Sequence, residues 1–310
     1  MDTQLPADLP PIHSAWTEAL RRGLRPSADT LREHLLSVHR CHAGFTEACA
    51  GRCRDDRGRN SYEWLIEAIA PDKHRRVLDL ACGSGPLLDL CHATLPSGTD
   101  LLGVDMSADE LALAAERLAP GAARLHQGMA QSLDFLPDDS VDAVLCHWAL
   151  TLMDPVEPVL AEAARVLRPG GVFAAIVDGE MTAAASYKAI NDCIYGWVQA
   201  DFPAYGAVDM GDARVRTAQG LADLAADMFG ASANAKAAPP AIALDGNVVR
   251  ASGPCRDLAQ EAAGFFYSSF VLSPESHAAM LADVARILAA DGGGDQGTFA
   301  LPINRLVVRV

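Results

Sequence analysis

A short apolar segment that ends in an acidic residue and a glycine-rich turn constrains the fold of this chain most strongly. The run Val77-Leu78-Asp79-Leu80 reads as a buried strand, and Ala81-Cys82-Gly83-Ser84-Gly85 follows it directly. Gly83 and Gly85 let the backbone turn tightly and let a ligand approach without interference from a Cβ atom. Open α/β sheets bind ligands at the carboxyl ends of their strands, so Asp79 at this strand end indicates a binding site.

Three kinds of nucleotide site compete for this turn. A P-loop requires Gly-x4-Gly-Lys-Ser/Thr, and no lysine follows Gly85. A dinucleotide site requires Gly-x-Gly-x-x-Gly, and Leu88 stands where its third glycine belongs. The third kind binds S-adenosylmethionine (SAM), a ligand without phosphate whose sites carry an acidic residue before the glycines. The turn by itself is a weak signal, so the downstream residues decide.

A second acidic residue ends the next predicted strand. The apolar run Leu101-Leu102-Gly103-Val104 leads into Asp105, about twenty residues beyond Gly85. This spacing fits the acid that accepts ribose hydroxyls at the end of the second strand of a βαβ unit. A carboxylate suits this role because it can accept two hydroxyl hydrogen bonds. The alternative, in which Asp105 only ends a strand, is weaker beside Asp79 and the glycines.

Strand patterns alternate with helix patterns between residues 71 and 180. The predicted strands cover residues 76–80, about 100–105, about 124–127, 142–147 and 171–177. Alternation of this kind predicts a parallel sheet with helices on both faces. A helix that starts near Pro158 ends at the Pro169-Gly170-Gly171 break.

These motifs, in this order, resemble those of class I SAM-dependent methyltransferases over roughly residues 60–180. Asp79 to Gly85 resembles the family's acidic-x-Gly-x-Gly-x-Gly motif, with Ala81 in place of the first glycine. Val141 to Leu150 resembles the fourth-strand motif, and Leu167 to Val172 resembles the Leu-(Arg/Lys)-Pro-Gly-Gly turn before the fifth strand. The resemblance implies an α/β fold, Rossmann-like and doubly wound, with a mostly parallel seven-stranded sheet.

The resemblance also implies where the methyl donor binds. Met129 replaces the family's usual aspartate after the third strand, so the contact to the adenine amino group must come from Gln131, from backbone or from water. The thioethers of Met106 and Met129 can pack on the adenine face. The expected cofactor-binding residues are Asp79, Ala81, Gly83, Gly85, Asp105, Met106, Met129, Ala130, Gln131 and His147. The donor would leave as S-adenosylhomocysteine.

The acceptor side depends on whether a base is needed. Methyl transfer is an in-line displacement, and only a hydroxyl or a protonated amine benefits from a base. His147 is the candidate catalytic base, since a neutral imidazole accepts a proton near pH 7; the alternative is a backbone contact to the cofactor. Asp212 and Arg214 could meet the amine and carboxylate of an amino acid-like acceptor, or Asp212 could cap a helix. The expected substrate residues are Tyr62, Trp148, Tyr195, Asp212 and Arg214.

Composition limits the class of partner and the compartment. The net charge of −15 argues against a duplex nucleic acid partner, which requires a basic face. Apolar runs of about 18 residues are absent from the sequence, and the N-terminus lacks a signal pattern, so no membrane partner and a cytoplasmic location are expected. The eight cysteines show no paired C-x2-C spacing, so cytosolic thiols and no metal are expected.

One segment is denser in metal-binding residue types. The helix-like stretch Leu31 to Arg52 and its flank carry His39, Cys41, His42, Cys49 and Cys53 with mixed spacing. A zinc site is conceivable there, but helix packing or an active-site flap is the better interpretation.

The chain divides into a cover and a catalytic body. Residues 1–70 are predicted as an N-terminal helical cover, and 71–310 as the SAM-binding domain with helical insertions at about 181–215 and 252–290. Residues 241–250 read as β-rich and 306–310 as the closing strand. The predicted helices at about 255–270 and 275–290 would separate these two last strands.

The sequence predicts a SAM-dependent methyltransferase acting on oxygen, nitrogen or sulfur of a small molecule, of amino acid or secondary-metabolite type. Two alternatives stay open: a protein- or RNA-modifying methyltransferase, and a non-catalytic SAM-fold partner protein. Cys146-His147-Trp148-Ala149 stands where many macromolecule-modifying enzymes carry Asn/Asp-Pro-Pro-aromatic. Asp79 and Asp105 count against a non-catalytic role. A homodimer is left open.

Overall fold

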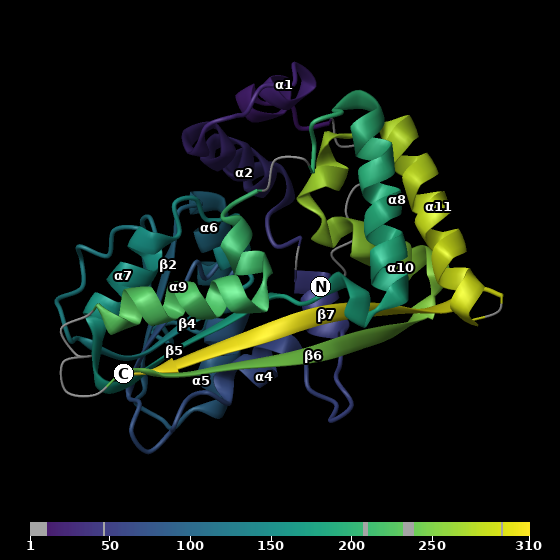
Figure 1. The fold of residues 1–310 in the computed structure, drawn as a ribbon. Helices are drawn as coiled ribbons and strands as arrows, with labels where there is room; N and C mark the ends of the chain where they lie inside the picture. Colours follow the sequence, from purple (N-terminus) through teal and green to yellow (C-terminus); the bar gives the residue numbers. More distant parts are fainter. Residues whose placement is uncertain (1–10, 46, 207–209, 232–238, 293) are drawn as a thin grey trace. The chain divides into compact units, whose positions relative to one another are not determined.

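A computed structural model describes residues 11–45, 47–206, 210–231, 239–292 and 294–310, which contain a seven-stranded sheet (Figure 1). The strand order is β3-β2-β1-β4-β5-β7-β6. Strands β1 to β5 pair in parallel, and β7 runs antiparallel to β5. The strands are β1 (Arg76–Leu80), β2 (Asp100–Asp105), β3 (Arg124–Gln127), β4 (Val141–His147), β5 (Leu167–Asp178), β6 (Ala241–Pro254) and β7 (Gln296–Arg309). This architecture confirms the predicted fold class.

The chain forms two compact units. The sheet unit comprises residues 61–180, 211–247 and 303–310, and the helical unit comprises residues 1–60, 181–210 and 248–302. The first segment of the helical unit ends at residue 60, and the division at residue 70 into an N-terminal helical cover and a SAM-binding domain stays a prediction. Strands β6 and β7 each begin in one unit and end in the other.

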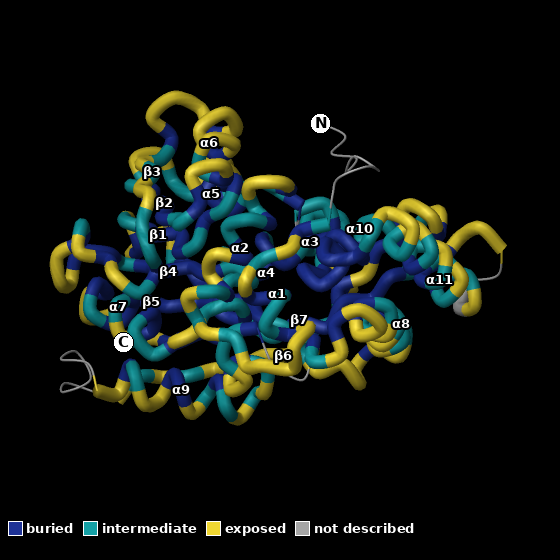
Figure 2. Tube along the Cα trace, turned by 90° about the horizontal axis from the view of Figure 1, so that it is seen from above, coloured by how far each residue is buried: buried dark blue, intermediate teal, exposed yellow. Residues whose placement is uncertain are grey.

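The middle strands of the sheet are buried on both faces. Residues 143–146 of β4 and 172–177 of β5 have no exposed surface, and the strands around them are dark in Figure 2. Strands covered on both faces read as continuous apolar runs, which is why the sequence predicted them well. The sheet unit's helices are α4 (Ser61–Ile66), α5 (Pro86–Thr94), α6 (Ala108–Arg117), η1 (Leu150–Leu152), α7 (Glu157–Val166), η3 (Ala213–Arg216) and α9 (Ala218–Gly230).

The turn at Gly170 and Gly171, inside β5, needs both of its glycines. Gly170 has a φ of +82°, which L side chains rarely adopt. A Cβ atom on Gly171 would lie 2.8 Å from the carbonyl oxygen of Arg168. The predicted break therefore follows from backbone geometry. Pairing of Leu167 with Val141 starts β5 before this turn, earlier than residue 171.

The helical unit is built from helices of three separate chain segments. Within it, α8, α10 and α11 lie side by side (Figure 1), and Trp197 of α8 donates to Asp283 of α11 at 3.0 Å. Its helices are α1 (Ala15–Arg21), α2 (Ala28–His42), α3 (Glu47–Arg52), η2 (Met181–Ala183), α8 (Ala185–Asp201), α10 (Cys255–Phe265), η5 (Tyr267–Val271) and α11 (Pro274–Gly292). The helices that separate β6 from β7 are α10, η5 and α11, as predicted.

Two sequence expectations for this unit were wrong. The helix expected from Leu31 to Arg52 is broken into α2 and α3, and Gly44 between them has a φ of +76°. Strand β7 begins at Gln296, whereas the closing strand was expected only at residues 306–310. Glycine is needed at position 297 in this strand, because a Cβ atom there would lie 2.8 Å from the Leu288 carbonyl oxygen.

Most of the segment rich in histidine and cysteine packs against other helices of the helical unit, although Cys41 is exposed. His39 Nε2 lies 3.1 Å from the hydroxyl of Tyr267, and Cys49 and Cys53 are fully buried. Among the residues that the structure describes, no three His, Cys, Asp or Glu side chains are grouped to hold a metal ion. Helix packing is therefore what the structure shows for this segment.

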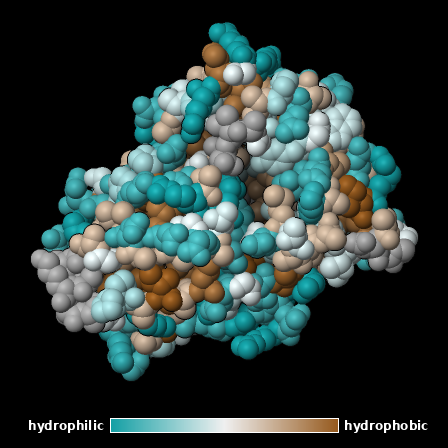
Figure 3. All heavy atoms as spheres, viewed as in Figure 1, coloured by the Kyte–Doolittle hydropathy of each residue, from teal (hydrophilic) through white to brown (hydrophobic). Residues whose placement is uncertain are grey.

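The surface in Figure 3 is mostly hydrophilic, with scattered apolar residues. Within the described ranges, Leu24, Leu113 and Met181 are the large apolar residues that are well exposed. None of the helices described is long and apolar enough to cross a membrane.

Acid is expected to destabilise the helical unit through His34. The His34 ring is buried, stacks on Trp16 with centroids 5.1 Å apart and contacts Ser14 Oγ at 3.0 Å. Burial lowers its pKa from 6.5 to about 4. Below pH 6.5 the unfolded chain takes up the proton first, so stability is complete above that pH and falls toward pH 4. The expected loss from this residue is about 3 kcal/mol.

Urea unfolding of the wild type and of His34→Phe at pH 7, 5.5 and 4.5 would check this expectation. Phenylalanine can still stack on Trp16 but takes up no proton, so the variant should lose less stability between pH 7 and 4.5. Burial also lowers the pKa of His42 and His277, so some pH dependence should persist. Equal pH dependence in both proteins would contradict the assignment to His34.

Candidate active site

The glycine turn after β1 places three residues in the left-handed backbone region within five positions. Ala81 has a φ of +59°, Gly83 of +52° and Gly85 of +80°. A Cβ atom on Gly85 would lie 3.1 Å from the side chain of Ala114 on α6, so glycine is needed there for two reasons. Ala81 occupies a conformation that suits glycine, which explains why the resembling motif has glycine at this position.

Asp105 ties the end of β2 to this turn. Its Oδ2 accepts from the backbone N–H of Gly83 at 2.9 Å, and its Oδ1 accepts from that of Ser107 at 2.8 Å. Each carboxylate oxygen has a second lone pair, so the side chain can also accept ribose hydroxyls. The predicted ribose acid therefore lies directly against the predicted glycine turn.

Asp79 is a buried acid with an unused acceptor. Its side chain is 2% exposed, and its Oδ2 has no hydrogen-bond partner among the described residues. Burial, and then the negative charge of Asp105, raise the pKa of this carboxyl well above its usual value. A buried carboxylate is stable only when it is paired, so the site is suited to a ligand that carries a positive charge. The ammonium group of SAM has this chemistry, and the residues present therefore fit the cofactor.

The loops after β2 and β3 lie beside this pair of acids. The N–H of Gly128 donates to the Asp105 carbonyl at 3.0 Å, which joins the two loops. Met106, Met129 and Gln131 are partly buried, as residues that line a binding surface should be. Ala130 instead packs into the sheet core, so only its backbone can face a ligand.

His147 at the end of β4 is held by the first turn of α4. Its Nε2 lies 2.8 Å from Ser61 Oγ, and the ring of Tyr62 stacks on it with centroids 3.8 Å apart and planes at 20°. Burial lowers the pKa of the imidazole to about 3. The ring is therefore neutral at physiological pH but a weak base. This environment argues against the catalytic base role expected from the sequence.

Trp148 and Asp178 form a polar contact that the sequence analysis missed. Trp148 has a φ of +59°, and its indole N–H donates to Asp178 Oδ1 at 2.9 Å. Asp178 Oδ2 accepts from Arg216 at 3.2 Å. Asp178 lies at the carboxyl end of β5, as Asp79 and Asp105 lie at the carboxyl ends of β1 and β2. This shared position was the signal in the sequence that could have identified Asp178. Bulky residues in left-handed conformations cluster at functional sites, which favours a ligand-facing role for Trp148.

Asp212 and Arg214 neutralise one another. Asp212 caps η3 by accepting from the backbone N–H of Arg214 at 2.8 Å, and the two side chains form an ion pair of 2.6 Å. Arg214 also pairs with Glu157. Two charges engaged in this way are poorly placed to receive the amine and carboxylate of a zwitterion.

Tyr195 belongs to the helical unit, whereas every other predicted site residue lies in the sheet unit. Its ring meets Tyr205 edge-on, with centroids 6.1 Å apart. The structure therefore brings together the predicted cofactor residues and, with them, Tyr62, His147 and Trp148.

Comparisons with known proteins agree with this geometry. Residues 78–175 match the family model described as a methyltransferase domain. The chain is 34% identical over 118 residues to a demethylmenaquinone methyltransferase of Symbiobacterium thermophilum, covering 36% of this chain and 47% of that protein. It is 32% identical over 126 residues to a malonyl-[acyl-carrier protein] O-methyltransferase of Pectobacterium atrosepticum, covering 40% and 47%. The chain thus spans about half the length of these curated relatives.

Solved structures show the same fold at low sequence identity. The [4+2]-cyclase SpnF superposes with a TM-score of 0.51 at 17% identity, covering 92% of this chain and 97% of that one. A phosphoethanolamine N-methyltransferase of Haemonchus contortus gives 0.51 at 15% identity, covering 92% and 60%. With the strand order, the glycine turn and the two acids, these findings define a class I methyltransferase fold. Residues 78–175 thus resemble a methyltransferase domain in sequence, and the seven-stranded sheet around them has the fold of such enzymes.

Proposed function

We propose that this protein is a SAM-dependent methyltransferase that acts on a small-molecule acceptor. The buried Oδ2 of Asp79 carries the proposal, because it is an unused acceptor, suited to a positively charged donor, beside the turn where a ligand can approach the backbone. The relatives support it, since they are named as methyltransferases of quinones, of fatty acids and of malonyl-[acyl-carrier protein]. One protein that shares the fold is named as a cyclase, so the fold alone does not determine the reaction.

Different residues of the sheet unit would bind different parts of SAM. Asp79 would pair with the ammonium group, and Asp105 would accept the ribose hydroxyls while fixing the turn through Gly83. Met106 and Met129 would pack on the adenine. When bound, SAM supplies an electrophilic methyl group. The contribution of the protein is alignment of donor and acceptor and exclusion of water.

The acceptor that fits best does not need His147 as a base. An imidazole with a pKa of about 3 removes protons poorly at neutral pH. An ionised carboxylate, an enolate-type carbon, a thioether or a neutral amine needs no such base. Oxygen, nitrogen and sulfur acceptors of secondary metabolism therefore stay within the proposal. The relative named as a quinone C-methyltransferase extends it to carbon acceptors.

The proposal includes a cytoplasmic location and neither nucleic acid nor membrane as a partner. The charge of −15 supports the exclusion of nucleic acid. A homodimer remains compatible with it. A protein- or RNA-modifying methyltransferase and a non-catalytic SAM-fold protein are the alternatives that an experiment must separate.

Two measurements test the proposed function. Calorimetric titration with S-adenosylhomocysteine should show one site per chain, and absence of binding would overturn both the enzymatic and the sensor interpretations. Methyl transfer from labelled SAM should then be assayed with a reduced naphthoquinone, a fatty acid, a thioether and an RNA pool. Transfer to a small molecule supports the proposal, whereas transfer to RNA alone would contradict it.

A further inference from the structure

Three residues of neighbouring strands form a row across the sheet. His147 of β4 pairs with Ile176 of β5, and Ile176 pairs with Arg305 of β7. On the other side of β4, Asp79 of β1 pairs with Leu145. Because the two strands are parallel, His147, two residues beyond Leu145, lies level with Ala81, two residues beyond Asp79. One end of the row therefore lies beside the glycine turn, and the other end is Arg305.

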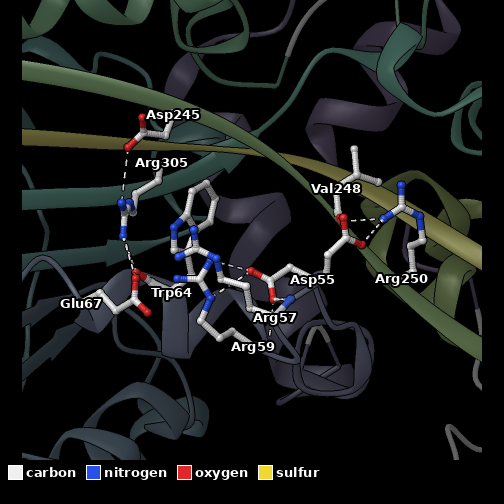
Figure 4. Close-up of polar contacts among 10 residues, drawn as sticks. Asp55, Arg57, Arg59, Trp64, Glu67, Asp245, Val248, Arg250 and Arg305 are labelled. Atoms are coloured by element: carbon white, nitrogen blue, oxygen red, sulfur yellow. Dashed lines mark hydrogen bonds and ion pairs between the residues drawn. The ribbon is translucent and has the colours of Figure 1, made fainter.

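Arg305 is heavily engaged at its end of the row (Figure 4). Its side chain is 16% exposed, its Nη1 donates to the Trp64 carbonyl at 2.8 Å, and its guanidinium lies 4.6 Å from the centroid of the Trp64 ring. It also contacts Glu67 at 3.7 Å and Asp245 of β6 at 3.3 Å. An arginine can make these contacts together because its fork of donors is planar and can also face an aromatic ring.

The helix α4 joins the two ends of the row. Ser61 and Tyr62 in its first turn hold His147, and Trp64 near its end is held by Arg305. Ser61 and Trp64 are three residues apart, which is about 4.5 Å along a helix, whereas three adjacent strands span about 10 Å. The long Arg305 side chain has to cover the remaining distance from β7, so this one short helix contacts both ends of the row.

We propose that Arg305 is a positioning residue for the active site, which fixes α4 so that Ser61 and Tyr62 hold the His147 ring beside the donor site. Arg305 contacts neither reactant in this scheme. It acts by restricting the helix that holds His147. The inference rests on the proposed function, because it assigns His147 to the wall of that site.

Arg309 provides a matched control on the same strand. Its Nη1 donates to the carbonyl of Ala68, just beyond α4, at 3.4 Å, and its strand partner is Val172. Arg309→Gln thus also removes an arginine–carbonyl contact from β7, but outside the row. A merely structural role for Arg305 would make the two variants alike.

The test measures two quantities in the wild type, R305Q, R309Q, S61A and R305Q/S61A. The first is the affinity for S-adenosylhomocysteine. The second is the pKa of the His147 ring, followed by NMR. In R305Q and in S61A the affinity should fall roughly tenfold, and the ring pKa should rise toward 6.5 as water reaches the imidazole. R309Q should change neither quantity. The affinity of the double variant should be no more than about tenfold below that of the wild type, because both changes release the same ring.

Three results would overturn the proposal: an unchanged ring pKa in R305Q, equal effects of R305Q and R309Q, or effects of R305Q and S61A that multiply to about a hundredfold. If R305Q does not fold, R305K replaces it. Lysine can reach the Trp64 carbonyl but not Glu67 and Asp245 together, so a smaller rise in the pKa of the His147 ring is expected. An unchanged ring pKa in R305K would overturn the proposal. Absence of ligand binding in the wild type would defeat the proposed function, while the ring pKa would still report on Arg305.

Discussion

Replacing Asp79 by asparagine should weaken S-adenosylhomocysteine binding by about a hundredfold while making the free protein more stable. The variant loses a buried charge that would pair with the ligand ammonium, and such losses cost about 3 kcal/mol. The free protein no longer holds an unpartnered carboxylate at 2% exposure, which should stabilise it by about 1–2 kcal/mol at neutral pH. Calorimetry and urea unfolding measure the two effects.

The gain in stability should depend on pH in a defined direction. The pKa of Asp79 is raised in the folded protein, so folding favours the protonated acid, and this advantage is lost as pH rises through the raised value. The difference between Asp79→Asn and wild type should therefore grow from pH 4 to pH 8. Asp89→Asn, an exposed acid on α5, is the control and should change neither property appreciably. A destabilised Asp79→Asn protein with intact binding would refute the assignment.

Replacing Asp105 by asparagine should cost about a hundredfold in affinity and also destabilise the protein by about 1–3 kcal/mol. Both oxygens of Asp105 accept backbone N–H groups, from Gly83 and Ser107, and an amide group can accept only one of them. The other N–H group would face the amide nitrogen, which is itself a donor. The two acid variants should therefore lose ligand binding together but change stability in opposite directions.

Adenosine separates the two acids further, because it has the ribose hydroxyls but no ammonium group. Asp79→Asn should bind adenosine as the wild type does, whereas Asp105→Asn should lose it. These titrations would be run beside those with S-adenosylhomocysteine. Equal loss of adenosine binding in both variants would contradict the division of roles.

The parts of the fold that the sequence predicted well depend on neighbouring residues in the chain. Strands β1, β2, β4 and β5 are apolar because both of their faces are covered, and the turn that starts at Ala81 follows from local backbone geometry. Asp79 and Asp105 were identified because each lies at the end of such a strand. Local pattern therefore sufficed for strands β1 to β5 and for placing the two acids beside the glycine turn.

The parts that the sequence did not predict depend on contacts between distant segments. Arg305 lies about 240 residues from Trp64, and nothing in the spacing of either residue indicates the pair. The role expected of His147 assumed the ordinary pKa of an imidazole, but burial lowers that pKa, and Ser61 and Tyr62, which contact the ring, come from another segment. Asp178 and Trp148 likewise meet only when β4 and β5 are paired.

The helical unit cannot be removed or exchanged as a terminal block. Its three segments are separated in the chain by stretches of the sheet unit, and β6 and β7 run from one unit into the other. Contacts between distant segments form only after the intervening loops close, which slows folding. A shortened chain that lacks residues 1–60 would therefore keep two of the three segments of that unit without the third. To replace the helical unit while keeping the sheet unit, changes would have to be made at internal positions of the chain as well as at its start.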